Sequence, residues 1–265
     1  MIIIGELINT SRKAIGPAVD QRDKAYIQEV ARKQVEGGAH YVDVNAGTKI
    51  HNEPEILTWL VKTVQEAVDV PLCIDSPNPK AIEAALEVHK GQALVNSITA
   101  EKERYKTILP LLVKYKARVV TLCMDDTGMP ETAAQRLAIV DVLAKGLLDA
   151  GVKREDIFFD PLVKPVSVNT HFGVEVLETI RNIHQKYEGV HTTCGLSNVS
   201  FGLPGRKLLN QAFLVLCMAH GMDSVILDPL DKTMMSLLIA SKALLGRDEY
   251  CVEYLSAYRE GRQTG

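Results

Sequence analysis

The chain has 265 residues, a length that fits either two small domains or one (β/α)8 barrel, which typically needs roughly 250 residues. Hydrophobic residues make up 46% and charged residues 24%, which excludes a disordered chain and indicates a substantial core. The net charge of −3, with acidic and basic residues mixed along the chain, argues against nucleic acid or an anionic membrane surface as a partner.

Apolar runs and cysteine usage indicate the compartment of the chain. Runs such as 1–4 and 212–219 are far shorter than the roughly 20 residues of a membrane helix, and the N-terminus lacks a signal-peptide pattern. The five cysteines are scattered, with no CxxC pair, which argues against a disulfide framework and against a zinc or iron–sulfur site. We therefore expect a cytoplasmic protein with reduced cysteines.

Short apolar, β-rich runs alternate with amphipathic segments of helical length, which is typical of βα units and a parallel sheet. In chain order the predicted strands are 2–7, 41–45, 71–75, 93–97, 118–124, 157–160, 192–197 and 224–228. The predicted helices are 23–36, 53–68, 79–89, 102–115, 131–150, 172–187, 205–220 and 231–245. We expect Thr170 to cap the sixth helix, Pro79 to lie in a first helical turn, and Gly151 and Gly221 to follow helix ends.

No proline-rich linker, charge block or low-complexity stretch divides these eight units. We therefore predict one domain, 1–265, folded as a single closed (β/α)8 barrel of the TIM type. A doubly wound open sheet is the alternative, but the GxGxxG turn that such a sheet carries after its first strand is missing. The segment 246–265 is predicted to be a C-terminal extension that packs either across the barrel bottom or against another subunit.

Polar residues close every predicted strand, and in this type of barrel the chemistry lies at the carboxyl ends of the strands. Asp, Asn and Ser also favour turns and helix caps, so each of these residues taken singly has a structural explanation. Together, with hardly a cation among them, they predict a site for a ligand rich in N–H donors. In strand order they are Glu6 and Asn9, Asp43 and Asn45, Asp75 and Ser76, Asn96 and Ser97, Asp125 and Asp126, Asp160, Ser197 and Asn198, and Asp228.

Several other chemistries lack their motifs. The usual phosphate site of such barrels follows strands seven and eight, where Asp228 and Asp231 would repel a phosphate. GxSxG, HExxH and P-loop patterns do not occur. The seven histidines lie mostly at predicted helix ends or in loops, and only His171, after strand six, is a less certain case. We expect no metal site, because the adjacent Asp125 and Asp126 are more typical of a solvated turn.

The strand-end motifs, read together, resemble the pterin-binding methyltransferases over nearly the whole chain. The motifs are GELIN (5–9), DVNAG (43–47), IDS (74–76), VNS (95–97), DPL (160–162) and GLSNVSFGLPGR (195–206). The last run is the specific part, since IDS or DPL alone would be weak. The family includes methyltetrahydrofolate:corrinoid protein methyltransferases and the folate module of cobalamin-dependent methionine synthase.

The resemblance implies an enzyme that moves a methyl group between N5 of tetrahydrofolate, or 5-methyltetrahydrofolate, and the Co(I) atom of a corrinoid. The corrinoid, a cobalamin, is expected on a separate corrinoid protein, because the DxHxxG signature of corrinoid carriers is absent. The resemblance also implies a homodimer. It leaves open the physiological direction of transfer, the cognate corrinoid protein, the original methyl donor and the preferred number of folate glutamates.

Matching positions carry the family's site residues over to this chain. The resemblance places Asp75, Asn96 and Asp160 against the pterin ring, Asn198 near N5 and Arg206 near the benzoyl-glutamate tail. We predict Asn198, Asp75 and Asp160 to be catalytic, with Asn198 assisting N5 protonation and the proton arriving from solvent through the carboxylates. The predicted folate-binding residues are Glu6, Asn9, Asp43, Asn45, Asp75, Asn96, Asp160, Ser197, Asn198 and Arg206.

Two rival functions remain at this point. Dihydropteroate synthase is also a pterin-binding barrel, but it expels diphosphate, which calls for cations near the leaving group. This chain has acids at strand eight instead and lacks that family's lysine and Arg-x-His placement. The second rival is a non-catalytic folate-binding subunit, which sequence alone does not separate from an enzyme.

Overall fold

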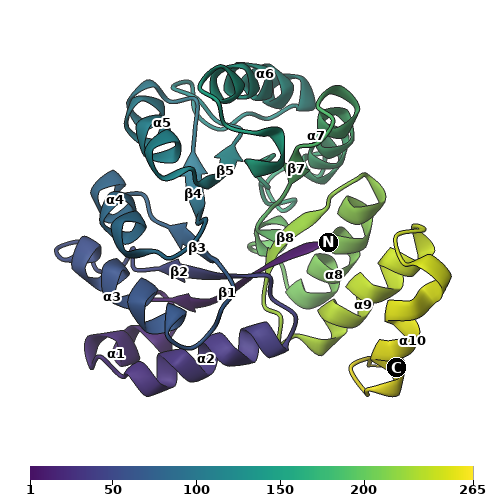
Figure 1. Cartoon of the computed structure of the whole chain (residues 1–265). Coiled ribbons are helices and arrows are strands. Elements are labelled where there is room, and N and C mark those ends of the chain that lie inside the picture. Colours follow the sequence, from purple (N-terminus) through teal and green to yellow (C-terminus); the bar gives the residue numbers. More distant parts are fainter. Residues whose placement is uncertain (265) are drawn as a thin grey trace.

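Parallel strands alternate with helices along the chain and close into a barrel (Figure 1). The structure is a computed structural model that describes residues 1–264. Hydrogen-bonded neighbours follow the order β7-β6-β5-β4-β3-β2-β1-β8, and the Ile226 N–H donates to the Cys194 carbonyl at 3.2 Å, which joins the two ends. The strands are β1 (Ile2–Asn9), β2 (Tyr41–Asn45), β3 (Leu72–Asp75), β4 (Leu94–Ile98), β5 (Arg118–Leu122), β6 (Ile157–Asp160), β7 (His191–Thr192) and β8 (Ser224–Leu227). The predicted (β/α)8 barrel is confirmed.

Helices surround this sheet on its outer face (Figure 1). They are α1 (Ile15–Asp20), α2 (Lys24–Glu36), α3 (Glu53–Gln65), α4 (Pro79–Val88), α5 (Lys102–Tyr115), α6 (Ala133–Asp149), α7 (Phe172–Lys186), α8 (Arg206–Ala219), α9 (Lys232–Leu244) and α10 (Val252–Arg259). Short 3-10 turns add η1 (Arg154–Asp156), η2 (Leu196–Ser200) and η3 (Glu249–Cys251). Among residues 1–264 we find no helix with the length and hydrophobicity to cross a membrane.

Successive strand residues face opposite sides of the barrel wall, and both sides are packed. On β2, Val42 and Val44 pack outward against Leu57 and Leu60 of α3 in the main core cluster. Inward-facing residues form a second cluster that fills the middle of the barrel. Its fully or almost fully buried members come one from each of six strands: Ile4, Tyr41, Cys73, Leu94, Val120 and Phe158.

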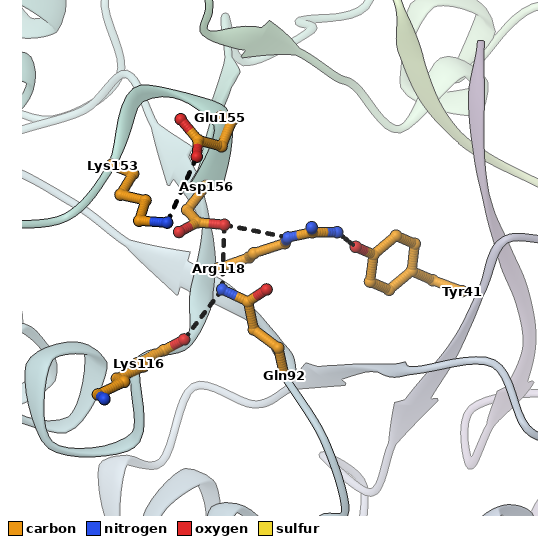
Figure 2. A network of polar contacts seen from close by, with 7 residues as sticks. All are labelled: Tyr41, Gln92, Lys116, Arg118, Lys153, Glu155 and Asp156. Carbon is orange, nitrogen blue, oxygen red and sulfur yellow. Dashed lines mark hydrogen bonds and ion pairs between the residues drawn. The ribbon is translucent and has the colours of Figure 1, made fainter.

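A polar network closes the end of the barrel where the strands begin (Figure 2). Arg118, the first residue of β5, donates from Nε to Asp156 Oδ1 at 3.1 Å and from Nη1 to the Tyr41 hydroxyl. The Gln92 amide donates to the same Asp156 oxygen at 3.0 Å and also to the Lys116 carbonyl. These contacts tie the starts of β2 and β5 to the turn before β6.

Most predicted helix boundaries hold within a few residues, with two differences. Pro79 does begin α4, and Gly151 and Gly221, with φ of +86° and +118°, follow α6 and α8 as expected. Thr170 does not cap α7, since His171 is the N-cap residue and no side chain provides a cap hydrogen bond there. The connection after β1 contains α1, which the sequence pattern did not predict.

The predicted seventh strand, 192–197, was wrong beyond Thr192, the one residue it shares with the observed β7. Regular pairing ends at Thr192, and residues from Leu196 onward form η2. Leu196 and Val199 are buried while the two residues between them are exposed, which is the three-residue spacing of a 3-10 turn rather than the alternation of a strand.

The C-terminal extension packs on the outside of the barrel beside α9 (Figure 1). Lys242 of α9 forms an ion pair with Glu253 of α10, and the Thr264 N–H donates to the Ser236 hydroxyl of α9 at 2.9 Å. Of the two predicted placements, this excludes a position across the barrel bottom for residues up to 264. The predicted domain runs on to Gly265, which lies outside the described residues.

Candidate active site

Three of the predicted ligand-binding side chains lie side by side at the carboxyl ends of adjacent strands. Asn45 of β2 is in register with Asp75 of β3, which is in register with Asn96 of β4. The Asn45 amide donates to Asp75 Oδ2 at 2.8 Å, while its oxygen accepts from the Gly47 N–H at 2.8 Å. Burial raises the pKa of Asp75, although the Asn45 hydrogen bond and the Arg104 charge oppose that effect. Asn45 therefore fixes the orientation of the carboxyl group.

Asp43 lies one layer deeper in the barrel than this row. It is 3% exposed, it is in register with the core residue Cys73, and its Oδ2 has no hydrogen-bond partner among residues 1–264. Burial, and next the charge of Asp75, raise the pKa of Asp43 well above its usual range. Asp43 therefore lies beneath the site with its neutral form favoured by burial, and its predicted role in folate binding stays a prediction.

Asp160 ends β6, with Leu122 of β5 beside it in register. Its side chain is buried, and Oδ1 accepts from the Leu162 N–H at 2.8 Å. Burial raises the pKa of Asp160 to about 7, against the opposing effects of the Leu162 N–H and the Arg136 guanidinium. This carboxyl group can therefore exchange a proton near neutral pH, which is the property of a general acid or base.

The predicted Asn198 and Ser197 lie on η2, where both side chains are exposed. Arg206, at the start of α8, donates from Nη2 to the Ser197 carbonyl at 2.6 Å and from Nε to the Ser200 hydroxyl at 3.0 Å. The guanidinium thus holds the turn that carries Asn198. These hydrogen bonds use only part of the donor set of Arg206, which leaves N–H groups for a further partner. The predicted contact of Arg206 with a folate tail stays a prediction.

Glu6 and Asn9, at the end of β1, are occupied by local partners. Glu6 forms an ion pair with Arg12 at 2.8 Å, and burial raises the pKa of Glu6 although Arg12 opposes that effect. Asn9 accepts from the Ser11 N–H and hydroxyl at 2.9 and 2.7 Å.

A cavity of about 190 Å³ is lined by Glu6, Ser197 and Asp228 among other residues. A wider cavity, about 760 Å³, lies between α2, α9 and α10 and is lined by none of the predicted site residues.

Among residues 1–264, no three His, Cys, Asp or Glu side chains are grouped closely enough to hold a metal ion. Asp125 instead accepts from the Thr127 N–H and hydroxyl at 2.9 and 2.6 Å, and Asp126 accepts from the Lys102 N–H at 3.3 Å. Both are therefore used in local turn and helix-start contacts.

Sequence reasoning missed two arginines behind the strand ends. Arg104 of α5 and Arg136 of α6 lie close enough for their charges to lower the pKa values of Asp75 and Asp160. An arginine within an amphipathic helix is ordinary in sequence, and the pattern contains no signal that these two point toward the barrel.

Comparisons with known proteins give a consistent family. A family model described as pterin binding enzyme matches residues 6–228. Methylcorrinoid:tetrahydrofolate methyltransferase of Eubacterium limosum is 38% identical over 264 residues, covering 99% of this chain and 97% of that protein. Methionine synthase of Mycobacterium tuberculosis (strain ATCC 25618 / H37Rv) is 28% identical over 239 residues, which cover 85% of this chain and 20% of that longer protein.

Solved structures with a similar fold include dihydropteroate synthases. The enzyme of Xanthomonas albilineans in complex with 7,8-dihydropteroate superposes with a TM-score of 0.73 at 17% identity, covering 92% of this chain and 93% of that one. The Yersinia pestis enzyme in a sulfonamide drug complex gives 0.72 at 15% identity, covering 92% and 94%. At such identities the likeness concerns the fold alone.

Proposed function

The chain belongs to the pterin-binding enzyme family, and from that membership we propose that it is a methyltransferase acting between tetrahydrofolate and a corrinoid. The methyl group moves between N5 of the folate and the cobalt of a corrinoid carried by a separate protein. The observation that carries this proposal is the 38% identity to a methylcorrinoid:tetrahydrofolate methyltransferase across almost all of both chains.

The donor and acceptor pattern of the strand ends suits a pterin. Its 2-amino-4-oxopyrimidine edge presents N–H donors in a plane, which a carboxylate can accept in pairs as it accepts a guanidinium. We assign this recognition to Asp75, Asn96 and Asp160, of which Asp75 is already oriented by Asn45. We expect Glu6, Asn9 and Ser197 to lie around the ring and Asp43 to lie beneath it.

Methyl transfer to cobalt requires help at N5. The Co(I) electron pair forms the Co–C bond as the C–N5 bond breaks, and N5 keeps the bonding pair, which must be met by a proton. In the opposite direction N5 attacks the methyl carbon, Co(I) leaves with the bonding pair, and N5 releases its proton. Such proton transfer is typically worth about 10² to 10⁴-fold in rate.

Asn198 is the residue we assign to N5. Its amide can donate or accept, so it can bind N5 in both protonation states. We propose that the proton reaches N5 from solvent through the carboxyl groups of the site. The exposure of Asn198 on η2 leaves it accessible to a substrate at the open end of the barrel.

The corrinoid must approach that open end. Reacting atoms have to come within about 3.5 Å, so the carrier protein must seat its cobalt directly over the strand ends. Exposed apolar side chains on loops that follow the strands, namely Met129, Val168 and Phe201, suit contact with such a carrier.

We also propose that the protein is a cytoplasmic homodimer. Four of the five cysteines are buried and all five are free thiols, which fits a reducing compartment. The homodimer rests on the family resemblance, and light scattering should return twice the chain mass of 29.2 kDa. The chain mass itself would contradict it.

An anaerobic spectroscopic assay tests the function. The protein is mixed with 5-methyltetrahydrofolate and free Co(I) cobalamin, and loss of the Co(I) absorbance is followed as methylcobalamin forms. Protein-dependent formation supports the proposal. If calorimetry shows folate binding but neither free cobalamin nor any supplied corrinoid protein is methylated, a non-catalytic folate-binding subunit replaces it. Absence of folate binding overturns the pterin assignment.

A further inference from the structure

Two arginines that no motif singles out bind the main chain directly behind the proposed ring contacts. We propose that Arg104 and Arg136 are positioning residues, which hold Asp75, Asn96 and Asp160 in place for the pterin by binding the carbonyl groups that follow them. This inference rests on the proposed function, because it concerns the same ligand.

Arg104 links the ends of two neighbouring strands. The Ser97 carbonyl accepts from Arg104 Nε at 3.0 Å and from Nη2 at 2.7 Å. Nη2 also donates to the Ser76 carbonyl at 2.9 Å, and Nη1 donates to the Pro77 carbonyl at 2.5 Å. Ser76 directly follows Asp75, and Ser97 directly follows Asn96. One guanidinium therefore fixes the spacing between the two residues that are expected to grip the same edge of the ring.

Arg136 binds the carbonyl groups that follow Asp160, and it is itself 0% exposed. Its Nε donates to the Pro161 carbonyl at 2.6 Å, Nη2 to the Leu162 carbonyl at 3.3 Å, and Nη1 to the Glu131 carbonyl at 2.9 Å. All three hydrogen bonds thus go to main-chain oxygens, two of them in the turn that begins at Asp160.

That turn is strained, which is why it needs such support. Leu162 has a φ of +57°, a left-handed conformation that a side chain with a Cβ rarely adopts. It persists where surrounding contacts determine the backbone, and here the Leu162 N–H binds Asp160 Oδ1 while its carbonyl binds Arg136. The strained turn thereby orients the Asp160 carboxyl group.

A planar guanidinium is required for this role. Its five donors diverge in a fixed fork, so that one side chain can reach carbonyl groups on separate segments, whereas a lysine ammonium is a single point charge. Replacement by Lys therefore keeps the charge and removes the geometry, which is the property under test.

Arg118 provides a matched control at the opposite end of the barrel. It also points inward and bridges separate segments, through Asp156 and Tyr41 (Figure 2), but it contacts none of the strand ends that carry the proposed site. Arg118→Lys should therefore affect stability without affecting the ligand.

The experiment compares Arg104→Lys, Arg136→Lys and Arg118→Lys with the wild-type protein. Anaerobic calorimetry gives the Kd for tetrahydrofolate, and thermal unfolding gives Tm. We expect the first two variants to bind about tenfold or more weakly, by analogy with residues that orient the ligands of a metal ion. Arg118→Lys should bind within about twofold of wild type at a similar loss of Tm. Unchanged Kd in both site variants overturns the inference, as does an equal loss of affinity in Arg118→Lys.

A pH profile separates positioning from general stability. The groups that face Asp160 are the Arg136 cation and the buried Cys123 and Cys194 thiols. Arg136→Met removes the only cation of this set, so the pH at which folate binding is half-maximal should move upward, and it should stay in place in Arg118→Lys. A midpoint that does not move contradicts the role of Arg136. If Arg136→Met does not fold, Arg104→Lys still tests the inference.

Absence of folate binding by the wild-type protein overturns the proposed function and this inference together. Folate binding by the wild-type protein with unaffected variants overturns only this inference.

Discussion

The protonation of Asp160 depends on a balance between burial and hydrogen bonding. A buried carboxyl group tends to stay protonated, and here burial raises its pKa to about 7 despite the Leu162 N–H and the Arg136 cation. A pterin that offers N–H donors needs the ionised form. Ligand binding should therefore expel the proton and lower the pKa of Asp160.

Folate affinity should depend on pH through this group. Below about pH 7 the free protein holds the Asp160 proton, which binding must release, so the affinity should fall about tenfold for each pH unit below the pKa and level off above it. Calorimetry between pH 5.5 and 8.5 at about unit intervals measures the slope.

Asp160→Asn is the control for that slope. Its amide does not titrate, so its affinity should be weaker at pH 8 and should not follow the wild-type slope. A wild-type affinity that stays constant from about pH 6 to about pH 8 would contradict the assignment of Asp160 to the pterin.

Asn198→Ala tests the assignment of N5. The side chain is exposed on η2, so the substitution should leave folding intact. Loss of assistance at N5 should lower the single-turnover rate of methyl transfer at least about tenfold, the low end of the effect of acid catalysis. Wild-type turnover with free Co(I) cobalamin would rule the assignment out, and unchanged Tm is the check that the fold is retained.

The residues that could be predicted are those whose position follows from a rule of the fold. Asn45, Asp75 and Asp160 end their strands, Asn96 is in register with Asp75, and the carboxyl ends of parallel strands meet at one face of a barrel. Arg104 could not be found in this way, because its role depends on carbonyl groups of two other segments. Such contacts exist only after the chain has folded.

Among the elements, β1 shows how a helix supports a strand where the ladder is interrupted. Its register with β2 shifts between Gly5 and Ile8, and there the Leu7 N–H donates to Gln34 Oε1 of α2 at 2.9 Å. A Cβ on Gly5 would lie 2.5 Å from that oxygen, so only glycine allows Gln34 to approach. This bulge aims Glu6 and Asn9 at the open face.

Gln34→Ala should destabilise the protein through this bulge. Gln34 is fully buried, and its loss leaves the Leu7 N–H without that acceptor, which costs about 1 to 3 kcal/mol of the free energy of unfolding. Urea denaturation measures the change. Lys33→Ala, on the exposed face of the same helix, should shift stability by no more than about 0.5 kcal/mol. Equal effects of the two would show that the Leu7 contact is unimportant.

The seventh strand marks the limit of pattern-based prediction for elements. Residues 192–197 contain enough small and β-branched residues to suggest a strand, but only Thr192 and the residue before it pair regularly. Beyond Thr193, whose N–H still binds the Phe159 carbonyl at 2.9 Å, the chain follows buried apolar contacts of Leu196 into η2. Tertiary packing therefore overrides local propensity there, and it is this turn that carries Asn198.

At the scale of the whole molecule, the two ends of the barrel differ in what they do. The beginning of the strands is closed by the Arg118, Tyr41 and Asp156 network (Figure 2), and the middle is filled by apolar side chains. The polar row of Asn45, Asp75 and Asn96 occurs at the other end. Because the packed middle separates them, changes at one end should not alter the other.

A pair of substitutions on β2 tests this separation within a single strand. Tyr41 and Asn45 both face inward, four residues and about 13 Å apart. Tyr41→Phe removes the acceptor of the Arg118 hydrogen bond and should cost about 0.5 to 1.5 kcal/mol of stability, with the Kd for tetrahydrofolate unchanged.

Asn45→Ala should show the opposite balance. It removes the amide that orients Asp75 and should therefore weaken folate binding about tenfold. The free energy of unfolding should fall by only about 1 kcal/mol. Denaturation and calorimetry on both variants give the two quantities. If Tyr41→Phe weakened folate binding as much as Asn45→Ala does, a change at the amino-terminal end of the strands would have reached the ligand through the packed interior. The division of the barrel into a stabilising end and a binding end would then be wrong.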